Sequence, residues 1–392
     1  MGIKVFHLST SLSGGAGIAA RRLNTNLNYM GFESHLLSLY SGENPYTEYV
    51  SIIKRNWWSM LSGKSYAWVH LKLSTKTYFT IGSAPALDIH SIKKLGAPQD
   101  TIFHIHNWFN LLNTKLMRKM LQEGYNLVFT LHDQRLLTGG CHYSLKCKKY
   151  LQSCENCQYL PLFFKKIPKV NKSNLKSLFQ DYLNQITFIA PSRWIYELAI
   201  QSSSISSSQV KYIKNLHYIP ASSEFKKLSK PKITKKHLTL GIASLDKRSS
   251  LKGSDLVDKI IEAVKLNKFA IDFVFLSDLT KGDTRYQSFW KQIDYLLVLS
   301  RADNSPNVIH EAKLHGVPII ATNVGGIPEL LNLEYDYLLD LEKDITEQFL
   351  VLHQSILSNP KKITEIEIKN DYVSKNRLLI NEYLHFYNSI IS

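Results

Sequence analysis

The sequence predicts an α/β protein made of two Rossmann-like domains, each with a parallel sheet that has helices on both faces. Apolar, strand-like runs alternate with helical stretches in both halves of the chain, as in βαβ units. A glycine-rich turn at residues 14–17 separates the first of these strands from the first helix. The length of 392 residues is too great for one ordinary domain and suits two.

The first domain is predicted to span residues 1–218. Residues 41–98 carry no sharp motif and are expected to form helices and loops. Three strands end in polar groups, and the carboxyl ends of parallel strands are where such sheets bind ligands. These end groups are His106, His132 with Asp133, and Ser192. The predicted strands are residues 3–8, 33–40, 101–106, 127–133 and 188–192, and the predicted helices are residues 18–27 and 193–202.

The second domain is predicted to span residues 219–371, after a linker rich in lysine and proline. A helix is expected to open at residues 251–253 and run to residue 265, and residues 286–290 start a further element. Residues 372–392 have the apolar spacing of an amphipathic helix. The predicted strands of this domain are residues 238–243, 271–276, 294–299 and 317–321.

Residues 300–330 concentrate the polar signals of the second domain. Asp303 and Glu311 lie on either side of a predicted helix start, and the strand at residues 317–321 follows them. Gly325 and Gly326 come next, where glycine lets the backbone approach a ligand closely. A helix that begins after the two glycines would favour an anion at its N-terminus. The run therefore predicts a ligand site at the edge of the second sheet.

This run resembles the donor-site signature of retaining GT-B glycosyltransferases of family 4. The resemblance implies that Asp303 contacts the donor sugar, although the family has a longer glutamate there. It also implies that Glu311 holds the ribose of the nucleotide and that the glycine pair offers backbone amides. The matching residues are Asp303, Glu311, Ala312, Gly316, Pro318, Ala321, Gly325, Gly326, Pro328 and Glu329.

Other positions match the same family outside this run. Lys252 falls at the family's lysine, where a fixed positive charge would meet the charge growing on the departing phosphate. Lys247 or Arg248 would serve as its companion. His132 matches a histidine that touches the donor sugar, and GGAGIAARRL resembles the family's opening glycine segment. The predicted catalytic residues are His132, Asp303 and Lys252, and the predicted donor-binding residues are Gly15, Arg248, Lys252, Asp303, Asn307, Glu311, Gly325 and Gly326.

The resemblance implies a hexosyltransferase that moves a sugar, with retention, from a nucleoside-diphosphate donor to a glycan or lipid-linked acceptor in cell-surface polysaccharide synthesis. It implies two domains facing a cleft, a C-terminal helix that crosses back to the first domain, and no cofactor for catalysis. The segment between Phe275 and Tyr295 is shorter than in the family. The alternative is therefore a catalytically weak nucleotide-sugar-binding partner in a polysaccharide assembly complex. A nicotinamide oxidoreductase would need a G-x-G-x-x-G motif, which GGAGIAA only approximates.

All four cysteines lie in one short insertion, residues 139–160, which resembles an insertion in bacterial exopolysaccharide-type members of the family. In a cytosolic protein such a cluster is more often a metal site than a pair of disulfides. Four thiolates suit one tetrahedral zinc ion. We expect a structural zinc there, with a reduced cluster that merely packs as the alternative. The predicted ligands are Cys141, Cys147, Cys154 and Cys157.

The net charge of +16 fits nucleic acid, an anionic membrane or a phosphate-bearing substrate as partner. No nucleic-acid-binding motif is visible, so nucleic acid is not expected. Lysines concentrate at residues 226–236, which read as a solvated linker or, alternatively, as a docking site for anionic lipid. No apolar run approaches the ~20 residues of a membrane span, and the N-terminus lacks a signal sequence. The expected location is the cytoplasm, with the inner face of the membrane as the peripheral alternative.

Overall fold

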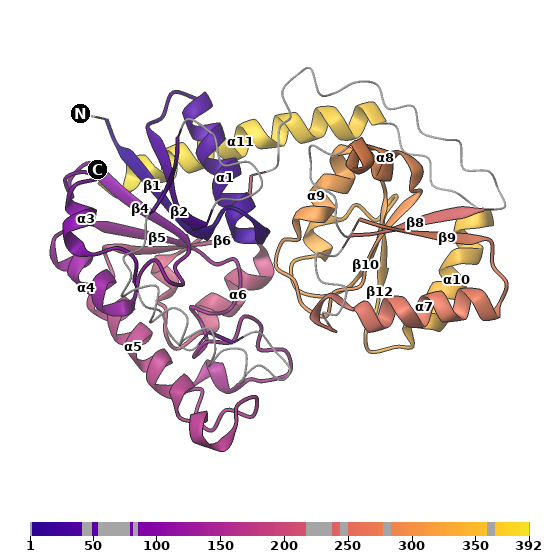
Figure 1. Ribbon diagram of the computed structural model, residues 1–392, viewed down its shortest axis with the longest axis horizontal. Helices are drawn as coiled ribbons and strands as arrows, with labels where there is room; N and C mark the ends of the chain where they lie inside the picture. The colour runs from indigo at the N-terminus through magenta and orange to yellow at the C-terminus, as the bar shows by residue number, and fades with distance from the viewer. Residues whose placement is uncertain are drawn as a thin grey trace. The chain divides into compact units, whose positions relative to one another are not determined.

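The computed structural model describes residues 2–40, 49–53, 79–80, 85–216, 237–243, 250–276, 284–358 and 365–391. The chain divides into two compact units. The first contains Met1–Leu216 with Arg377–Ser392, and the second contains His217–Asn376. Each unit has a parallel sheet with helices packed on it (Figure 1), which confirms the predicted α/β class with two Rossmann-like units. The predicted domain limits were residues 218 and 371.

The first unit is built on a seven-stranded sheet in the order β3-β2-β1-β4-β5-β6-β7. Every pairing in it is parallel. The strand order reverses between β1 and β4, which in open α/β sheets is where ligands bind. The strands are β1 (Lys4–Ser11), β2 (Ser34–Tyr40), β3 (Val50–Ile52), β4 (Thr101–Asn107), β5 (Asn126–Thr130), β6 (Ile186–Ala190) and β7 (Val210–Tyr212).

The glycine segment that was predicted as a turn is the first turn of helix α1 (Gly14–Tyr29). Gly17 explains why the helix can begin so close to β1. A Cβ atom at Gly17 would lie 2.1 Å from the Ser11 carbonyl oxygen, so only glycine fits there. The other helices that cover this sheet are α3 (Ile89–Lys93), α4 (Thr114–Gln122), α5 (Ile167–Asp181) and α6 (Arg193–Gln201).

The long C-terminal helix α11 (Glu365–Ile391) ends on the first unit, as predicted. Its residues Tyr383 and Tyr387 are buried in a cluster with Val5 and Ile102 of the sheet. The Tyr387 hydroxyl also lies 2.6 Å from the His104 ring on β4. The C-terminal part of the helix therefore belongs to the core of the first unit. Figure 1 shows this end of the helix, in yellow, next to β1.

The second unit has a five-stranded parallel sheet in the order β12-β11-β10-β8-β9. Apolar clusters cover both faces of this sheet. Strand β12 and helix α10 were not predicted. The strands are β8 (Leu238–Ile242), β9 (Ile271–Phe275), β10 (Tyr295–Val298), β11 (Ile319–Thr322) and β12 (Tyr337–Leu339), and the helices are α7 (Ser254–Leu266), α8 (Thr284–Gln292), α9 (Asn307–Leu314) and α10 (Ile345–Ser358).

Several sequence predictions fall outside the described residues, namely Lys247, Arg248 and the lysines of residues 226–236. After Gly326 the chain forms only a single 3-10 turn (Pro328–Leu330), so the expected helix N-terminus is absent from that described stretch. Across the described ranges no helix is long and apolar enough to span a membrane.

Candidate active site

An ion pair at the edge of the second sheet joins two of the predicted catalytic residues. Lys252 ends a 3-10 turn (Ser250–Lys252) beyond β8, and Asp303 follows the neighbouring strand β10. The Lys252 Nζ donates to Asp303 Oδ2 at 2.5 Å. The Asp303 side chain is only 9 % exposed, whereas that of Lys252 is 42 % exposed. The carboxylate is thus sheltered while the ammonium group reaches solvent.

The turn that carries Lys252 is fixed to the end of β10 by several contacts. Gly253 has a left-handed φ of 75°, and a Cβ atom there would lie 1.8 Å from the Leu299 carbonyl oxygen. The Arg301 amide donates to the Leu251 carbonyl oxygen at 2.8 Å. The Arg301 guanidinium also binds both carboxylate oxygens of Asp255 at 2.6 Å. These contacts position the turn that carries Lys252. No motif in the sequence marked the Arg301–Asp255 pair.

The predicted glycine pair packs directly against Asp303. The Gly326 amide donates to the Asp303 carbonyl oxygen at 3.0 Å. Gly325 has a φ of 58°, and a Cβ atom there would lie 1.9 Å from the same oxygen. The glycines therefore bring the loop after β11 against the loop after β10. The prediction was that the glycine amides bind the ligand. The Gly326 amide instead bonds within the protein.

Helix α9 carries two more of the predicted donor-binding residues. Asn307 is its first residue, and Glu311 lies one turn later. Both side chains are half-buried. The Tyr286 hydroxyl on α8 donates to Glu311 Oε2 at 3.2 Å. Tyr286 was not predicted as a site residue, because it was read only as the start of an element.

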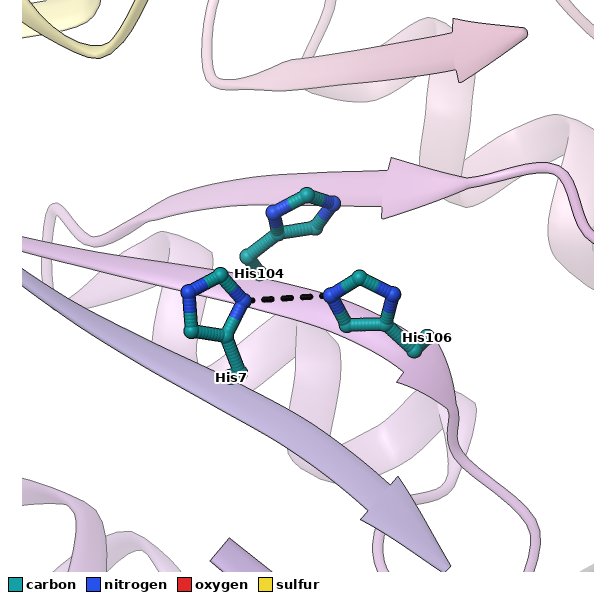
Figure 2. A group of neighbouring side chains, drawn as sticks. All are labelled: His7, His104 and His106. Carbon is teal, nitrogen blue, oxygen red and sulfur yellow. Dashed lines mark hydrogen bonds between the residues drawn. The ribbon is translucent and has the colours of Figure 1, made fainter. Parts of the chain in front are cut away.

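His132 of the first unit lies just beyond β5 and lines a small hollow. Its Nε2 atom is 3.0 Å from Nδ1 of His106 on β4, which in turn contacts His7 on β1 (Figure 2). Burial lowers the pKa of His132 to about 4, so this ring is neutral at pH 7. Gly15 lies separately, exposed in the first turn of α1. The hollow is lined by Ile105, His106, Trp108, Thr130, Leu131, His132, Asp133, Arg135 and Leu136.

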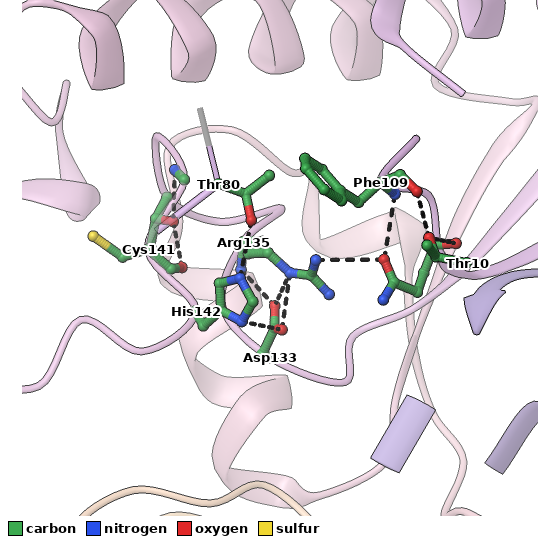
Figure 3. Close-up of polar contacts among 10 residues, drawn as sticks. Thr10, Thr80, Phe109, Asp133, Arg135, Cys141 and His142 are labelled. Atoms are coloured by element: carbon green, nitrogen blue, oxygen red, sulfur yellow. Dashed lines mark hydrogen bonds and ion pairs between the residues drawn. The ribbon is translucent and has the colours of Figure 1, made fainter. Parts of the chain in front are cut away.

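A polar network surrounds the residue after His132 (Figure 3). Asp133 accepts hydrogen bonds from the Arg135 amide and from its Nε, each at 2.9 Å. Burial opposes the charge of Asp133, but Arg135 and His142 outweigh it and lower the pKa of that carboxyl. Arg135 also donates to Asn107 Oδ1 at 3.4 Å. The hollow therefore has a charged carboxylate and a guanidinium beside a neutral imidazole.

The cysteine insertion is tied to this network through His142. The His142 ring lies 3.5 Å from the Asp133 carboxylate and 3.0 Å from Thr80 Oγ1 (Figure 3). Its neighbour Cys141 is buried and forms an isolated bridge with Phe79. The insertion thus packs against the loop that carries His132.

The four cysteines are free thiols, and all but Cys147 are buried. A hydrogen bond with Cys157, together with burial, raises the pKa of the Cys141 thiol. Within the described ranges, the only group of three or more metal-ligating side chains with ligand atoms within 4.8 Å of one another is His7, His104 and His106. Zinc on the cysteines stays a prediction.

Comparison with known proteins agrees with this arrangement. The family described as "Glycosyl transferases group 1" matches residues 231–355, the segment that contains Lys252, Asp303 and Glu311. The chain is 23% identical over 332 residues to the putative colanic acid biosynthesis glycosyl transferase WcaC of Escherichia coli, covering 76% of this chain and 78% of the relative. It is also 23% identical over 222 residues to an uncharacterised 41.2 kDa protein of the cps region of Klebsiella pneumoniae, covering 51% and 61%.

Solved structures show the same fold at low identity. HepE of Anabaena, in complex with UDP-glucose, has a TM-score of 0.56 and 15% identity, covering 98% of this chain and 99% of that one. Sucrose-phosphate synthase of Thermosynechococcus elongatus has a TM-score of 0.62 and 12% identity, covering 99% of each chain. The fold is that of GT-B glycosyltransferases, and the family match supports a glycosyltransferase.

Proposed function

We propose that this chain is a retaining glycosyltransferase that takes a hexosyl group from a nucleoside-diphosphate sugar. Its acceptor would be a glycan or a lipid-linked glycan in polysaccharide biosynthesis. The observation that carries the proposal is the Lys252–Asp303 pair, held 2.5 Å apart at the carboxyl edge of the second sheet. Retention rests on the resemblance of residues 300–330 to the family's donor signature.

The pair suits a donor that carries both a diphosphate and a sugar. The Lys252 ammonium group is accessible, so it can bind the diphosphate, on which negative charge grows as the glycosidic bond breaks. Asp303 accepts hydrogen bonds, and sugar hydroxyls are the groups that would donate them. In this proposal Lys252 stabilises the leaving group and Asp303 orients the sugar. The diphosphate leaves with the bonding electron pair, the acceptor oxygen bonds to the anomeric carbon on the face that the diphosphate vacates, and the acceptor's proton passes to an oxygen of the departing diphosphate.

Glu311 is the proposed ribose ligand. Its carboxylate is half-buried on α9 and is oriented by the Tyr286 hydroxyl at 3.2 Å. A carboxylate can accept hydrogen bonds from both ribose hydroxyls, and Tyr286 leaves acceptor capacity on its oxygens. Tyr286 would thus hold Glu311 in place for the nucleotide.

The similar structures indicate which compounds to test first. HepE was solved with UDP-glucose, and a pneumococcal O-GlcNAc transferase with a TM-score of 0.59 was solved with UDP and GlcNAc. Another similar structure is a lipopolysaccharide outer core galactosyltransferase, with a TM-score of 0.56. Together with the putative colanic acid relative, these proteins make UDP-hexoses the first donors and bacterial surface glycans the first acceptors to assay.

The decisive experiment combines calorimetric binding of UDP with release of UDP from UDP-hexoses, with and without glycan acceptors. We expect Glu311→Gln to weaken UDP binding about ten- to a hundredfold, the effect of losing a hydrogen bond to a charged group. The matched control is Glu334→Gln, an exposed glutamate of the same unit. A folded protein that binds no nucleotide would overturn the proposal. Binding without any turnover would favour the alternative of a weak partner protein.

Docking on anionic lipid is a second part of the proposal, and it rests on the sequence alone. The lysines of residues 226–236 would attract a negatively charged bilayer, where a lipid-linked acceptor is found. Sedimentation with phosphatidylserine vesicles, but not with phosphatidylcholine vesicles, is the expected result at low salt. Equal sedimentation with both would contradict it.

A further inference from the structure

Three histidines are buried side by side on one face of the first sheet. His7 is on β1, and His104 and His106 are on the adjacent strand β4 (Figure 2). They are 0 %, 0 % and 5 % exposed. Buried polar side chains are normally hydrogen-bonded, so the partners of these rings show how the cluster is held.

Two hydrogen bonds connect these rings to His132 in the hollow. His7 Nδ1 lies 3.1 Å from His106 Nε2. His106 Nδ1 lies 3.0 Å from His132 Nε2. His104 is outside this chain of rings, because its nitrogens lie 2.6 Å from the Tyr387 hydroxyl and 2.7 Å from Thr130 Oγ1. A continuous imidazole chain thus runs from the core at His7 to the hollow at His132.

Each ring of the chain is neutral at pH 7 and carries a single N–H. Burial lowers the pKa of His7 to about 3 and that of His132 to about 4. Burial and the neighbouring histidines also lower the pKa of His106 well below its ordinary value. With one proton per ring and two hydrogen bonds to fill, only two arrangements are consistent. The N–H groups all point toward His7 or all point toward His132.

His7 distinguishes these two arrangements. Its Nε2 atom is buried and has no hydrogen-bond partner among the described residues. If the protons point toward His7, this atom is a buried N–H without an acceptor. If they point toward His132, it is a bare lone pair. Orphaned N–H groups are rarer in protein interiors than under-satisfied acceptors, at least for the backbone, which favours the second arrangement.

We propose that His106, supported by His7, is a positioning residue that holds His132 as its Nδ1–H tautomer. His132 would then present an N–H at Nδ1, as a fixed hydrogen-bond donor and not a base at that atom. Only the effect of these rings on sugar transfer rests on the proposed function. The tautomer itself depends only on the contacts of His7, His106 and His132.

A metal ion on His7, His104 and His106 is the competing explanation of the cluster. Their ligand atoms lie within 4.8 Å of one another. However, the His104 and His106 rings are stacked, with centroids 4.2 Å apart and planes 29° apart. The lone pairs of imidazole lie in the ring plane, so two stacked rings do not direct them at one ion. The hydrogen bonds of His7 and His106, in contrast, form with the rings in the positions that the structure gives them.

The first test is ¹⁵N NMR of histidine-labelled protein at pH 7.5, which needs no substrate. In the intact protein, Nδ1 of His132 should resonate as a protonated nitrogen and Nε2 as a bare one. A protonated Nε2 of His132 would overturn the proposal whether or not the protein transfers sugars. Selective loss of the His7, His104 and His106 signals on titration with Ni²⁺ would favour the metal site and overturn it as well.

The second test compares two substitutions of the central ring. His106→Phe keeps a ring but removes the donor to His132, whereas His106→Asn keeps an amide N–H near the position of Nδ1. His106→Phe should lower the turnover number for UDP-hexose about two- to tenfold, the loss of one neutral hydrogen bond, and should mix the His132 tautomers. His106→Asn should restore both, and His104→Phe should leave the tautomer unchanged. Equal behaviour of the Phe and Asn variants in both readouts would refute the positioning role.

Discussion

Mild acid should destabilise the first unit, because it buries neutral histidines. The pKa of His7 is about 3 and that of His132 about 4 in the folded protein, against 6.5 when unfolded. Below pH 6.5 the unfolded chain therefore takes up protons that the folded chain does not, and stability falls as the pH falls. From pH 7.5 to 5 each ring costs about 2 kcal/mol, or about 4 kcal/mol for these two rings together, since each pH unit below 6.5 is worth about 1.36 kcal/mol. This is a large part of the typical stability of about 5–15 kcal/mol.

The assay is urea unfolding at pH 7.5, 6 and 5, read by pulse-labelling hydrogen exchange. Peptides from β1 and β4 report on the first unit, and peptides from β8 and β10 report on the second. His7→Asn removes one titrating ring and should reduce the pH dependence of the first unit by less than half, because burial also lowers the pKa of His104 and His106. His35→Asn is the control, because His35 is a partly exposed histidine on the neighbouring strand β2. A first unit whose unfolding free energy is the same at pH 7.5 and 5 would refute the reasoning.

Three further predictions follow from the ion pair, the C-terminal helix and the cysteines. Lys252→Met should lower the turnover number at least tenfold with little change in the Michaelis constant, because the charge it meets grows toward the transition state; Lys259→Met, at an exposed position of α7, should change neither. Tyr387→Phe should lower the urea unfolding free energy by about 1–3 kcal/mol, because it leaves a buried histidine nitrogen without its partner; Tyr29→Phe, at 88 % exposure, should have no effect. Protein purified without chelator should contain about one zinc per chain, as four thiolates imply; zinc-free, fully active protein with four free thiols would contradict this.

Much of the fold could be predicted because the signals are local. Strand-like runs alternating with helices are visible in the chain, and they correspond to β1, β4, β5, β8 and β10. The glycines at residues 14–17 were misread as a loop, because glycine has a low helix propensity. Tertiary contact overrides that preference, since α1 must begin against β1 and only glycine fits at Gly17. Helix α10 and strand β12 lacked any motif to mark them.

The contacts within the site were harder to predict, because they depend on which strands are neighbours. His104 and His106 are two positions apart, so the sequence alone predicts that they share one face of a strand. That His7 lies beside them requires the pairing of β1 with β4, which are separated by about ninety residues of chain. Similarly, the signature identified Asp303 and Lys252 separately, but only the packing of β8 against β10 brings them together.

The shorter Asp303 is compatible with a donor site because of what surrounds it. Its carbonyl oxygen is held by the Gly326 amide at 3.0 Å, and its carboxylate is sheltered. A sheltered carboxylate needs a cation in the absence of ligand, and Lys252 supplies one. On binding, the diphosphate would compete for the ammonium group while sugar hydroxyls replace it at Asp303. One charge-assisted contact is exchanged for another, so the ligand can enter without leaving either charge unpaired.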